Sequence, residues 1–490
     1  MATSLTTGRP WRVILAFSVP LLIGNVVQQL YQVVDTIVVG RELGVNSLAA
    51  VGATGSLLFL LLGFAWGMTS GFAIPTAQAF GAKDDAGVRR SVATGTLLAA
   101  VASILITIGG PLLAGPVLML LQTPPDLLPE ATLFTQVSFL GGGATMFFNY
   151  LSAIIRAIGD SKTPLIFLTI ACALNVVLVV VLVGPVGWGV AGAALATVVS
   201  QAVSVLLCLV FVRRRMPVLH VRREDWKITR NDIADHLRLG LPMGFQASII
   251  AIGTLVVQVA LNMLGAEAVA AYTTASRVDS LATALLASLG LAVSMYVAQN
   301  FGGRRPDRIR AGVKQAIWMT IIASAVLGAV LIAFGTNLVR LFVGEGSDEV
   351  VELAHLMLII NGSSYALLGV LFVLRGALQG LGQAMIPTIT GTVELFMRVG
   401  AAVALGAVLG FGGVALSNPL AWVGAVVILI PAYVRAHRAL ARMPVDPLEP
   451  TLTTPIALVG PDNSSLNVDA VVTEAVPIVV QKRWKKLLRR

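Results

Sequence analysis

The sequence predicts an all-α integral membrane protein with twelve transmembrane helices in two pseudo-symmetric six-helix bundles. Of its 490 residues, 57% are hydrophobic and 12% are charged, whereas a soluble domain carries about 25% charged residues. The mean hydropathy is +0.87. The two halves also repeat short motifs in the same order. This composition excludes a soluble enzyme and a nucleic-acid-binding protein, because so few charges could not solvate the surface of a chain of this length.

Each predicted span is a stretch long enough to cross the hydrocarbon layer, which takes about 20 apolar residues. Strands of about ten alternating residues are not evident, so the spans are predicted to be helices. The predicted spans are 13–38, 47–72, 91–115, 131–155, 164–184, 188–212, 238–262, 268–298, 313–343, 351–374, 385–409 and 411–434.

The basic residues predict that both termini are cytoplasmic. Lys and Arg gather on the cytoplasmic side of membrane helices. Here 30 of the 34 fall at the termini or in segments that follow an even-numbered span, including Arg375 in the segment 375–383. Arg277 and Arg398 fall inside spans. The +10 net charge is therefore explained by topology and not by a nucleic-acid partner.

The longest segment between spans predicts a division into two lobes. Residues 213–237 begin with RRRMPVLHVRREDWKITRND and separate an N-terminal lobe, 1–212, from a C-terminal lobe, 238–440. The remaining residues, 441–490, form a polar tail that contains Pro and Thr. This tail is predicted to be cytoplasmic and disordered.

An internal repeat relates the two lobes. AQAFG (77–81) returns as AQNFG (298–302), 221 positions later, and Leu43-Gly44 returns as Leu264-Gly265 at the same spacing. RAIGDSKTP also aligns with QGLGQAMIP. Because each half has an even number of spans, the copies share one orientation, and a cavity is expected between them.

Polar side chains form a stripe along the first span. Asn25, Gln28, Gln32 and Asp35 fall at i, i+3, i+7 and i+10, within an arc of about 80°. These groups are costly against lipid. They therefore act either as interhelical hydrogen-bonding groups or as the wall of a wet cavity. In the second interpretation, Asp35 exchanges a proton for a cationic substrate, because its proton affinity depends on burial and on a bound cation.

Further polar residues in later spans are candidates for the same cavity. Glu394 and Arg398 are i, i+4 neighbours, so they either neutralise each other or contact a ligand. Arg277 and Asp279 lie about 200° apart on their helix and need partners on other helices. The remaining candidates are Asn175, Thr197, Gln201 and Gln258.

The sequence contains no Gly-Lys dipeptide, HExxH or GxSxG motif. It therefore predicts no resident ATPase, no enzyme activity, no catalytic residue, no metal and no cofactor. The energy for any transport would come from an ion gradient or from the gradient of the substrate.

A family resemblance adds to this interpretation. PLLIGNVVQQLYQVVDTIVVGRELGVNSLAAVGA (20–53), GVAGAALATVVSQ (189–201), RAIGDSKTP and the repeated AQ-x-FG resemble the multidrug and toxic compound extrusion (MATE) family. The resemblance implies two six-helix bundles in an outward-facing V. It also implies a monomer in the inner or plasma membrane that exports amphipathic, often cationic, drugs or metabolites by H⁺ or Na⁺ antiport. Asp35 matches the acidic residue of the family's first helix.

Departures from the family pattern bear on the coupling ion. Val179 stands where some members have Asp, and Ile250 and Gln383 stand where the sodium-coupled branch has acids. The resemblance therefore favours H⁺ over Na⁺. Glu394 with Arg277 and Asp279 look like the DNA-damage-inducible (DinF-like) branch.

A flippase or exporter of a lipid or lipid-linked precursor is the alternative function. It would require more cationic residues in the cavity, to hold pyrophosphate, than Arg277 and Arg398.

Overall fold

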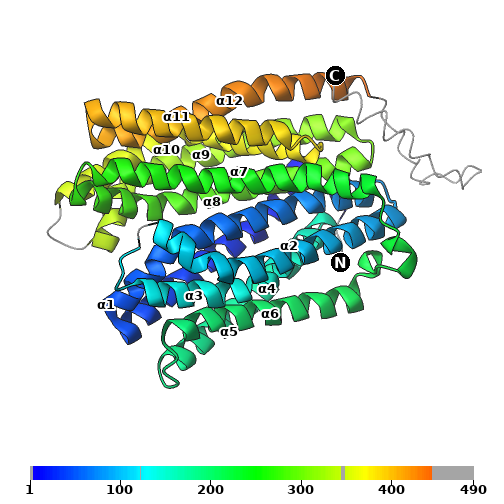
Figure 1. Ribbon diagram of the computed structural model, residues 1–490. Coiled ribbons are helices and arrows are strands. Elements are labelled where there is room, and N and C mark those ends of the chain that lie inside the picture. Colours follow the sequence, from blue (N-terminus) through cyan, green and yellow to red (C-terminus); the bar gives the residue numbers. More distant parts are fainter. Residues whose placement is uncertain (1–3, 122, 344–347, 444–490) are drawn as a thin grey trace, which may run out of the picture.

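The computed structural model describes residues 4–121, 123–343 and 348–443, and these residues form helices without a strand (Figure 1). The helices are α1 (Pro10–Gly81), α2 (Asp85–Leu120), α3 (Leu128–Leu140), α4 (Gly142–Ala157), α5 (Lys162–Val183), α6 (Gly189–Arg215), η1 (Pro217–Leu219), η2 (Arg223–Trp226), α7 (Arg230–Asn262), α8 (Ala266–Gly302), α9 (Pro306–Val343), α10 (Asp348–Gly380), α11 (Met385–Leu409) and α12 (Phe411–Ala441).

The described helices agree with the predicted spans. Eleven segments are long and apolar enough to cross a membrane, and the pair α3 and α4, bent by 45°, gives a twelfth if counted as one span. α1 contains the first two spans, Pro10–Gly44 and Asn46–Gly81. The bend between α3 and α4 falls at the run Gly141–Gly143, because glycine has a low helix propensity. The predicted all-α membrane fold is confirmed.

The backbone repeats along with the sequence. Gly44 has φ +83° and ψ −178°, and Gly265 has φ +101° and ψ 174°. Only glycine adopts this conformation readily, so the same residue breaks the chain between the first two spans of each half. Lys83 (φ 55°) and Arg304 (φ 53°) form a second pair at the same spacing.

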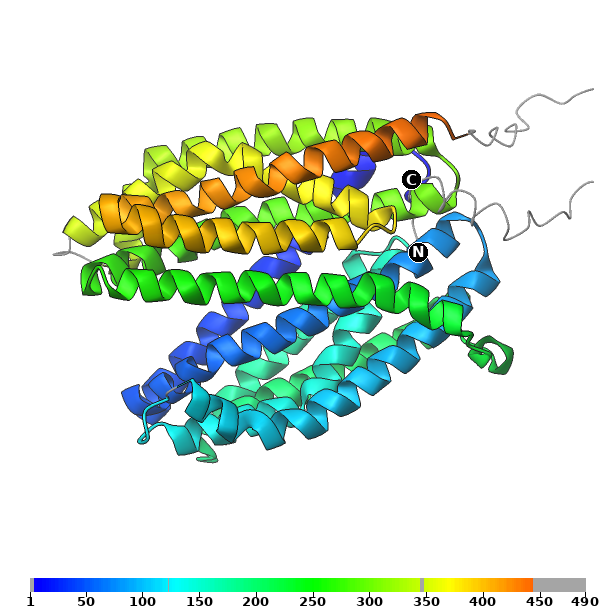
Figure 2. The ribbon, with the colours of Figure 1, turned by 45° about the horizontal axis from the view of Figure 1, so that its top comes forward.

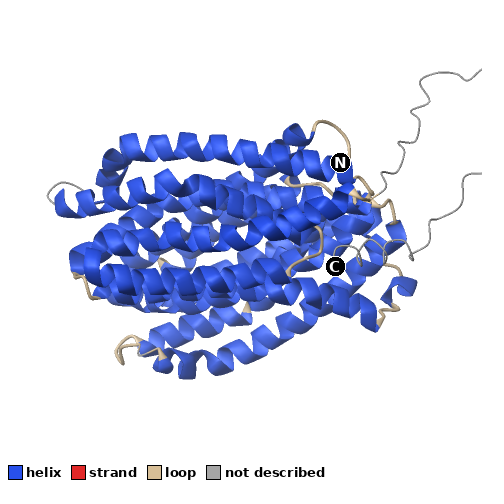
Figure 3. Ribbon diagram, turned by 90° about the horizontal axis from the view of Figure 1, so that it is seen from above, coloured by secondary structure: helices blue, strands red, loops and turns tan. Residues whose placement is uncertain are grey.

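The helices lie side by side along one direction (Figure 3) and form two bundles, α1–α6 and α7–α12 (Figure 2). The bundles approach each other at the end where α1 begins and α12 ends, and they diverge toward the other end (Figure 2). In the segment that joins the two bundles, Asp225 of η2 pairs with Arg89 of α2 in the N-terminal bundle at 3.2 Å. The predicted tail lies outside the described residues beyond Met443.

The repeated AQ-x-FG motifs hold the two bundles together in a reciprocal way. Gln78 Nε2 donates to the Gly380 carbonyl at the end of α10 (2.9 Å). Gln299 Nε2 donates to the Ala157 carbonyl at the end of α4 (2.7 Å). The glycines of the motifs allow the backbones to touch: Gly302 packs on the carbonyl of Gln78, and Gly81 packs on that of Gln299. Each lobe thus caps a helix end of the other lobe.

This contact predicts the effect of a single methyl group. A Cβ at Gly302 would overlap the Gln78 carbonyl, so Gly302→Ala should lower the free energy of unfolding by about 1–3 kcal/mol, as overpacking does. Gly109→Ala is the control, because a Cβ there meets nothing within 4 Å. Thermal melting in detergent measures both variants. Equal melting temperatures for the two would contradict a close-packed crossing.

Candidate substrate and coupling site

A polar chain crosses the interior of the N-terminal lobe and connects three helices. The Tyr31 hydroxyl of α1 hydrogen-bonds the Thr197 hydroxyl of α6 at 2.8 Å. Asn175 Nδ2 of α5 donates to the same Thr197 oxygen at 3.3 Å. The Thr197 hydroxyl therefore connects Tyr31 on α1 with Asn175 on α5.

Asp35 lies one helical turn after Tyr31 and near Cys172 of α5. Its Oδ1 is buried and accepts no hydrogen bond from the described residues. The Oδ1 of Asn175 and the Oε1 of Gln201 are likewise buried without a donor. A carboxylate and two amide oxygens therefore lie in this lobe without the donors that buried oxygens normally have. Each of these oxygens can accept from a proton or another cation.

Asn25 marks the point where the polar stripe of α1 meets the other lobe. Its Nδ2 donates to the Ser288 hydroxyl of α8 at 3.0 Å. Farther along the stripe, toward the diverging end, Gln28 and Gln32 are exposed. Asn25 is therefore an interlobe contact, and the assignment of Gln28 and Gln32 to a cavity wall stays a prediction.

Three buried charges form the polar centre of the C-terminal lobe. Glu394 of α11 accepts from Arg398 Nη2 at 3.2 Å and from Arg375 Nη2 of α10 at 2.9 Å. The three side chains are exposed by only 7%, 10% and 6%, respectively. Gln246 of α7 completes the group: with its oxygen turned toward Arg375 it accepts from Nε (2.8 Å) and Nη1 (3.1 Å). Glu394 and Arg398 thus pair with each other, and a second arginine shares the carboxylate.

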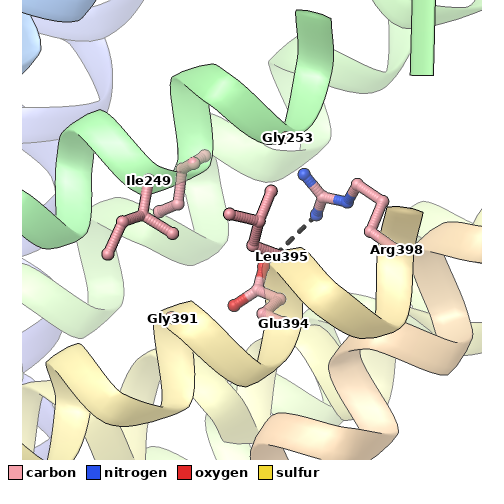
Figure 4. Close-up of a pocket in the computed structure, with 7 residues that line it drawn as sticks. Ile249, Gly253, Gly391, Glu394, Leu395 and Arg398 are labelled. Atoms are coloured by element: carbon pink, nitrogen blue, oxygen red, sulfur yellow. Dashed lines mark hydrogen bonds and ion pairs between the residues drawn. The ribbon is translucent and has the colours of Figure 1, made fainter. Parts of the chain in front are cut away.

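The Arg398 guanidinium points from α11 toward α7 across a narrow pocket (Figure 4). The pocket is a narrow gap between the two helices that leaves no room for a water molecule. A Cβ at Gly253 would lie 3.5 Å from Arg398 Nη1, an ordinary contact distance, so the guanidinium lies close to the backbone of α7. Arg398 Nε is buried and has no acceptor in the part of the chain that the structure describes. The pocket is lined by Ile249, Ile250, Gly253, Gly391, Glu394, Leu395 and Arg398.

Asp279 has partners on another helix, as its position predicted. Its Oδ1 accepts from the Tyr365 hydroxyl at 2.6 Å and from Asn361 Nδ2 at 3.1 Å, both on α10. It also interacts electrostatically with Arg398. Asp279 therefore belongs to the same charged interior as Glu394.

The last two candidates, Gln258 and Arg277, do not contact the charged interior of the lobe. Gln258 Nε2 donates to Asn262 Oδ1, one turn farther along α7, at 3.0 Å. Arg277 is exposed, and its guanidinium has no hydrogen bond or ion pair to any described residue. The structure thus brings Asp279, Glu394 and Arg398 together but leaves Gln258 and Arg277 apart from them.

Arg375 is the charged site residue that sequence reasoning missed. It was assigned to a cytoplasmic segment, 375–383, but α10 continues to Gly380 and buries it. The prediction of a loop at Arg375 was wrong. A base near the end of an apolar stretch resembles a loop residue unless the acid that pairs with it is known. Glu394 is the signal that could have found it. A buried acid needs a basic partner, and Arg375 is a base at the end of the preceding apolar stretch.

Comparison with known proteins decides the family. The MatE family model matches twice, at residues 20–181 and 242–404, one copy in each half of the chain.

The chain belongs to the MatE family.

Its MatE relatives include the Bacillus subtilis (strain 168) "Probable multidrug resistance protein YoeA", which is 30% identical over 386 residues, 77% of this chain and 83% of that protein. The "Multidrug export protein MepA" of Staphylococcus haemolyticus (strain JCSC1435) is 23% identical over 82% of this chain and 89% of its own length. These names are those of multidrug exporters.

Solved structures agree on the fold. A crystal structure described as MATE in complex with MaL6 superposes with a TM-score of 0.85 at 24% identity, covering 90% of this chain and 99% of that one. An outward-facing multidrug resistance MATE family transporter superposes with a TM-score of 0.83 at 23% identity, covering 90% and 99%. The chain is thus a multi-pass membrane protein of a family of multidrug efflux transporters, and it is not an enzyme. Its assignment to the DinF-like branch stays a prediction.

The charged centre of the C-terminal lobe predicts a strong effect of one substitution. Glu394→Gln leaves two buried guanidinium groups without a carboxylate, so the free energy of unfolding should fall by about 3–5 kcal/mol. Asp279→Asn is the matched control, because an amide oxygen can still accept from Tyr365 and Asn361. The melting temperature of each variant in detergent measures the difference. If Glu394→Gln melts no lower than Asp279→Asn, the two arginines do not depend on the acid.

Proposed function

We propose that this MatE protein exports amphipathic cations from the cytoplasm in exchange for protons, by alternating access between its two lobes. Asp35 carries the proton, and the side chains of the N-terminal lobe around it take the cationic end of the substrate. The observation that carries this proposal is the buried Oδ1 of Asp35, which has no donor among the described residues. A bound proton or a bound cation would each supply the missing partner.

The surroundings of Asp35 favour an exchange of one for the other. The carboxyl has no arginine or lysine as an ion-pair partner in the described residues, in contrast to Glu394. A permanent cation would keep the carboxylate ionised and lower its affinity for a proton. Asn175 and Gln201 contribute further acceptors without a net charge. Protonation and substrate binding therefore compete for one group, which is the requirement for antiport.

The proton is favoured over sodium by the small number of carboxylates. In the N-terminal lobe Val179 lies on α5 one turn after Asn175, so it adds no oxygen ligand beside Asp35. A single carboxyl group is sufficient for a proton.

The direction of transport follows from the position of the basic segments. Lys and Arg cluster at the end where the lobes touch, so this end is assigned to the cytoplasm. The diverging end then opens to the outside of the plasma membrane, and substrate leaves in the conformation described here. Rocking of the two lobes about the region between them would open the opposite end.

Export of a lipid-linked precursor is the less favoured function. Pyrophosphate would need several free cations, but Arg375 and Arg398 both bind Glu394. The shared carboxylate therefore leaves neither guanidinium free for a pyrophosphate.

The proposal predicts the behaviour of Asp35→Asn. In proteoliposomes, transport of ethidium driven by an imposed pH gradient should fall to the level of protein-free vesicles, because the amide cannot carry a proton. Binding of the dye should weaken by about tenfold as the charge is lost. Glu42→Gln is the control, an exposed acid seven residues along the same helix. Wild-type transport by Asp35→Asn would remove Asp35 from the coupling scheme.

The coupling ion is tested separately. Vesicles with only a pH gradient should accumulate dye, and vesicles with only a sodium gradient should not, because Asp35 lacks a second carboxylate beside it. Each gradient is imposed with the membrane potential clamped by potassium and valinomycin. Dye uptake that follows the sodium gradient alone would overturn proton coupling.

A further inference from the structure

Residues 4–9, which precede α1 of the N-terminal lobe, form a strap that is bound to the C-terminal lobe. The Leu5 N–H donates to Gln299 Oε1 of α8 at 2.9 Å, and the Leu5 carbonyl accepts from Asn300 Nδ2 of α8 at 3.2 Å. The Leu5 side chain is 2% exposed and belongs to the same buried apolar cluster as Tyr296 of that helix. A segment at the edge of a domain stays ordered when contacts of this kind hold it. The strap is therefore anchored on the lobe opposite to the helix that it precedes.

An arginine of α9 holds the backbone of the strap. Arg308 Nη1 donates to the Gly8 carbonyl at 2.9 Å. Its Nη2 donates to the carbonyls of Thr7 at 3.1 Å and of Leu5 at 3.4 Å. Its Nε donates to Asn300 Oδ1 at 2.9 Å, so the two side chains bind the strap as one unit. Hydrogen bonds from a charged donor are about twice as strong as neutral ones, so Arg308 is the main polar anchor of the strap.

The residues that bind the strap are found in only one copy of the internal repeat. Asn300 is the third residue of AQNFG, and the equivalent residue of AQAFG, 221 positions earlier, is Ala79. The residue equivalent to Arg308 at the same spacing is Gly87. Alanine and glycine have no side-chain donor. The frame that the two lobes share therefore does not require these donors, and binding of the strap is a feature that the second copy adds.

One side chain connects the strap with the contact between the lobes. Gln299 accepts from the Leu5 N–H through its Oε1 and donates to the Ala157 carbonyl of α4 through its Nε2, at 2.7 Å. The bond from Leu5 holds the amide oxygen on the side of the strap, so the NH₂ group is directed to α4. Gln299 is 0% exposed, so water cannot replace a bond that it loses. The strap therefore strengthens the hydrogen bond that joins α8 to the N-terminal lobe.

We propose that the strap is a latch that keeps the two lobes together at the end assigned to the cytoplasm. The inference rests on the proposed function, because rocking of the lobes must break the bond from Gln299 to Ala157 before this end can open. When the strap leaves, Gln299 loses the N–H that orients it, and the conformation open to the cytoplasm gains population. Arg308 and Asn300 are positioning residues, which hold the strap and do not contact the exported molecule.

The test measures the distance between the lobes at this end of the full-length protein. Nitroxide labels are attached at Ala86→Cys of α2 and Ala311→Cys of α9, two exposed positions, in a background with Cys172→Ala and Cys208→Ala. Double electron–electron resonance in liposomes gives the ratio of molecules with a long distance to those with a short one. Arg308→Gln should raise this ratio about tenfold, the usual effect of one lost charged hydrogen-bonded contact.

A second variant and a matched control accompany Arg308→Gln. Leu5→Ala removes the buried anchor of the strap without touching the arginine, and it should raise the ratio in the same direction. Arg308→Lys should raise the ratio less than Arg308→Gln, because it keeps the charge without the fork. Arg310→Gln is the control, an arginine two residues along α9 whose Nε donates to His437 Nε2 of the same lobe at 3.1 Å. It should leave the ratio unchanged.

An unchanged ratio in both Arg308→Gln and Leu5→Ala would overturn the inference and assign the strap to packing alone, even if both variants melt at a lower temperature. An equal rise in Arg310→Gln would also overturn it, because the loss of any arginine at this end would then loosen the lobes. Ethidium uptake driven by a pH gradient is measured on the wild-type protein in parallel. If wild type takes up no ethidium, the proposed exchange of a cation for a proton fails, whereas the distances still decide whether the strap holds the lobes together.

Discussion

The structure depends on the requirement that polar groups inside the apolar layer find their partners within the protein. A charge that faces lipid has no water to solvate it. The chain meets this requirement in two different ways. In the C-terminal lobe Glu394 lies between Arg375 and Arg398, with Gln246 on the outer side of Arg375. In the N-terminal lobe Asp35 is left without such a partner. The first arrangement stabilises a lobe, and the second leaves a group that can exchange ligands.

The two lobes share a duplicated backbone, but their polar sites differ. Gly44 and Gly265 break the chain in the same conformation, and Gln78 and Gln299 bond helix ends of the opposite lobe in the same manner. The glycines of the two motifs bring backbones into contact at one end, so the lobes diverge at the other. The repeated residues are therefore structural, whereas the charges that give each lobe its chemistry are not repeated. Such a division is expected when two similar halves rock about a common contact.

The candidate site was predictable where it depends on helical periodicity and not where it depends on neighbours. Asp35, Asn175, Thr197 and Asp279 were found from their positions inside apolar stretches, because a polar side chain there is visible in the sequence. Asn25 belonged to the same stripe, but it bonds Ser288 at the contact between lobes. Gln258 bonds Asn262 on its own helix. Arg375 was taken for a loop residue because the end of α10 cannot be located from hydropathy when a buried acid compensates the base.

The sequence by itself determined that this protein crosses the membrane about twelve times, that its halves are duplicated and that it belongs among MATE-like exporters. Each follows from local quantities: the length of apolar runs, the spacing of Lys and Arg, and short repeated motifs. Only the tertiary structure decided which charges are paired, that Arg375 joins Glu394, and that Arg277 has no ion pair among the described residues. The reason is physical: pairing of a buried charge depends on distances between helices that are remote in sequence, and periodicity along one helix carries no information about them.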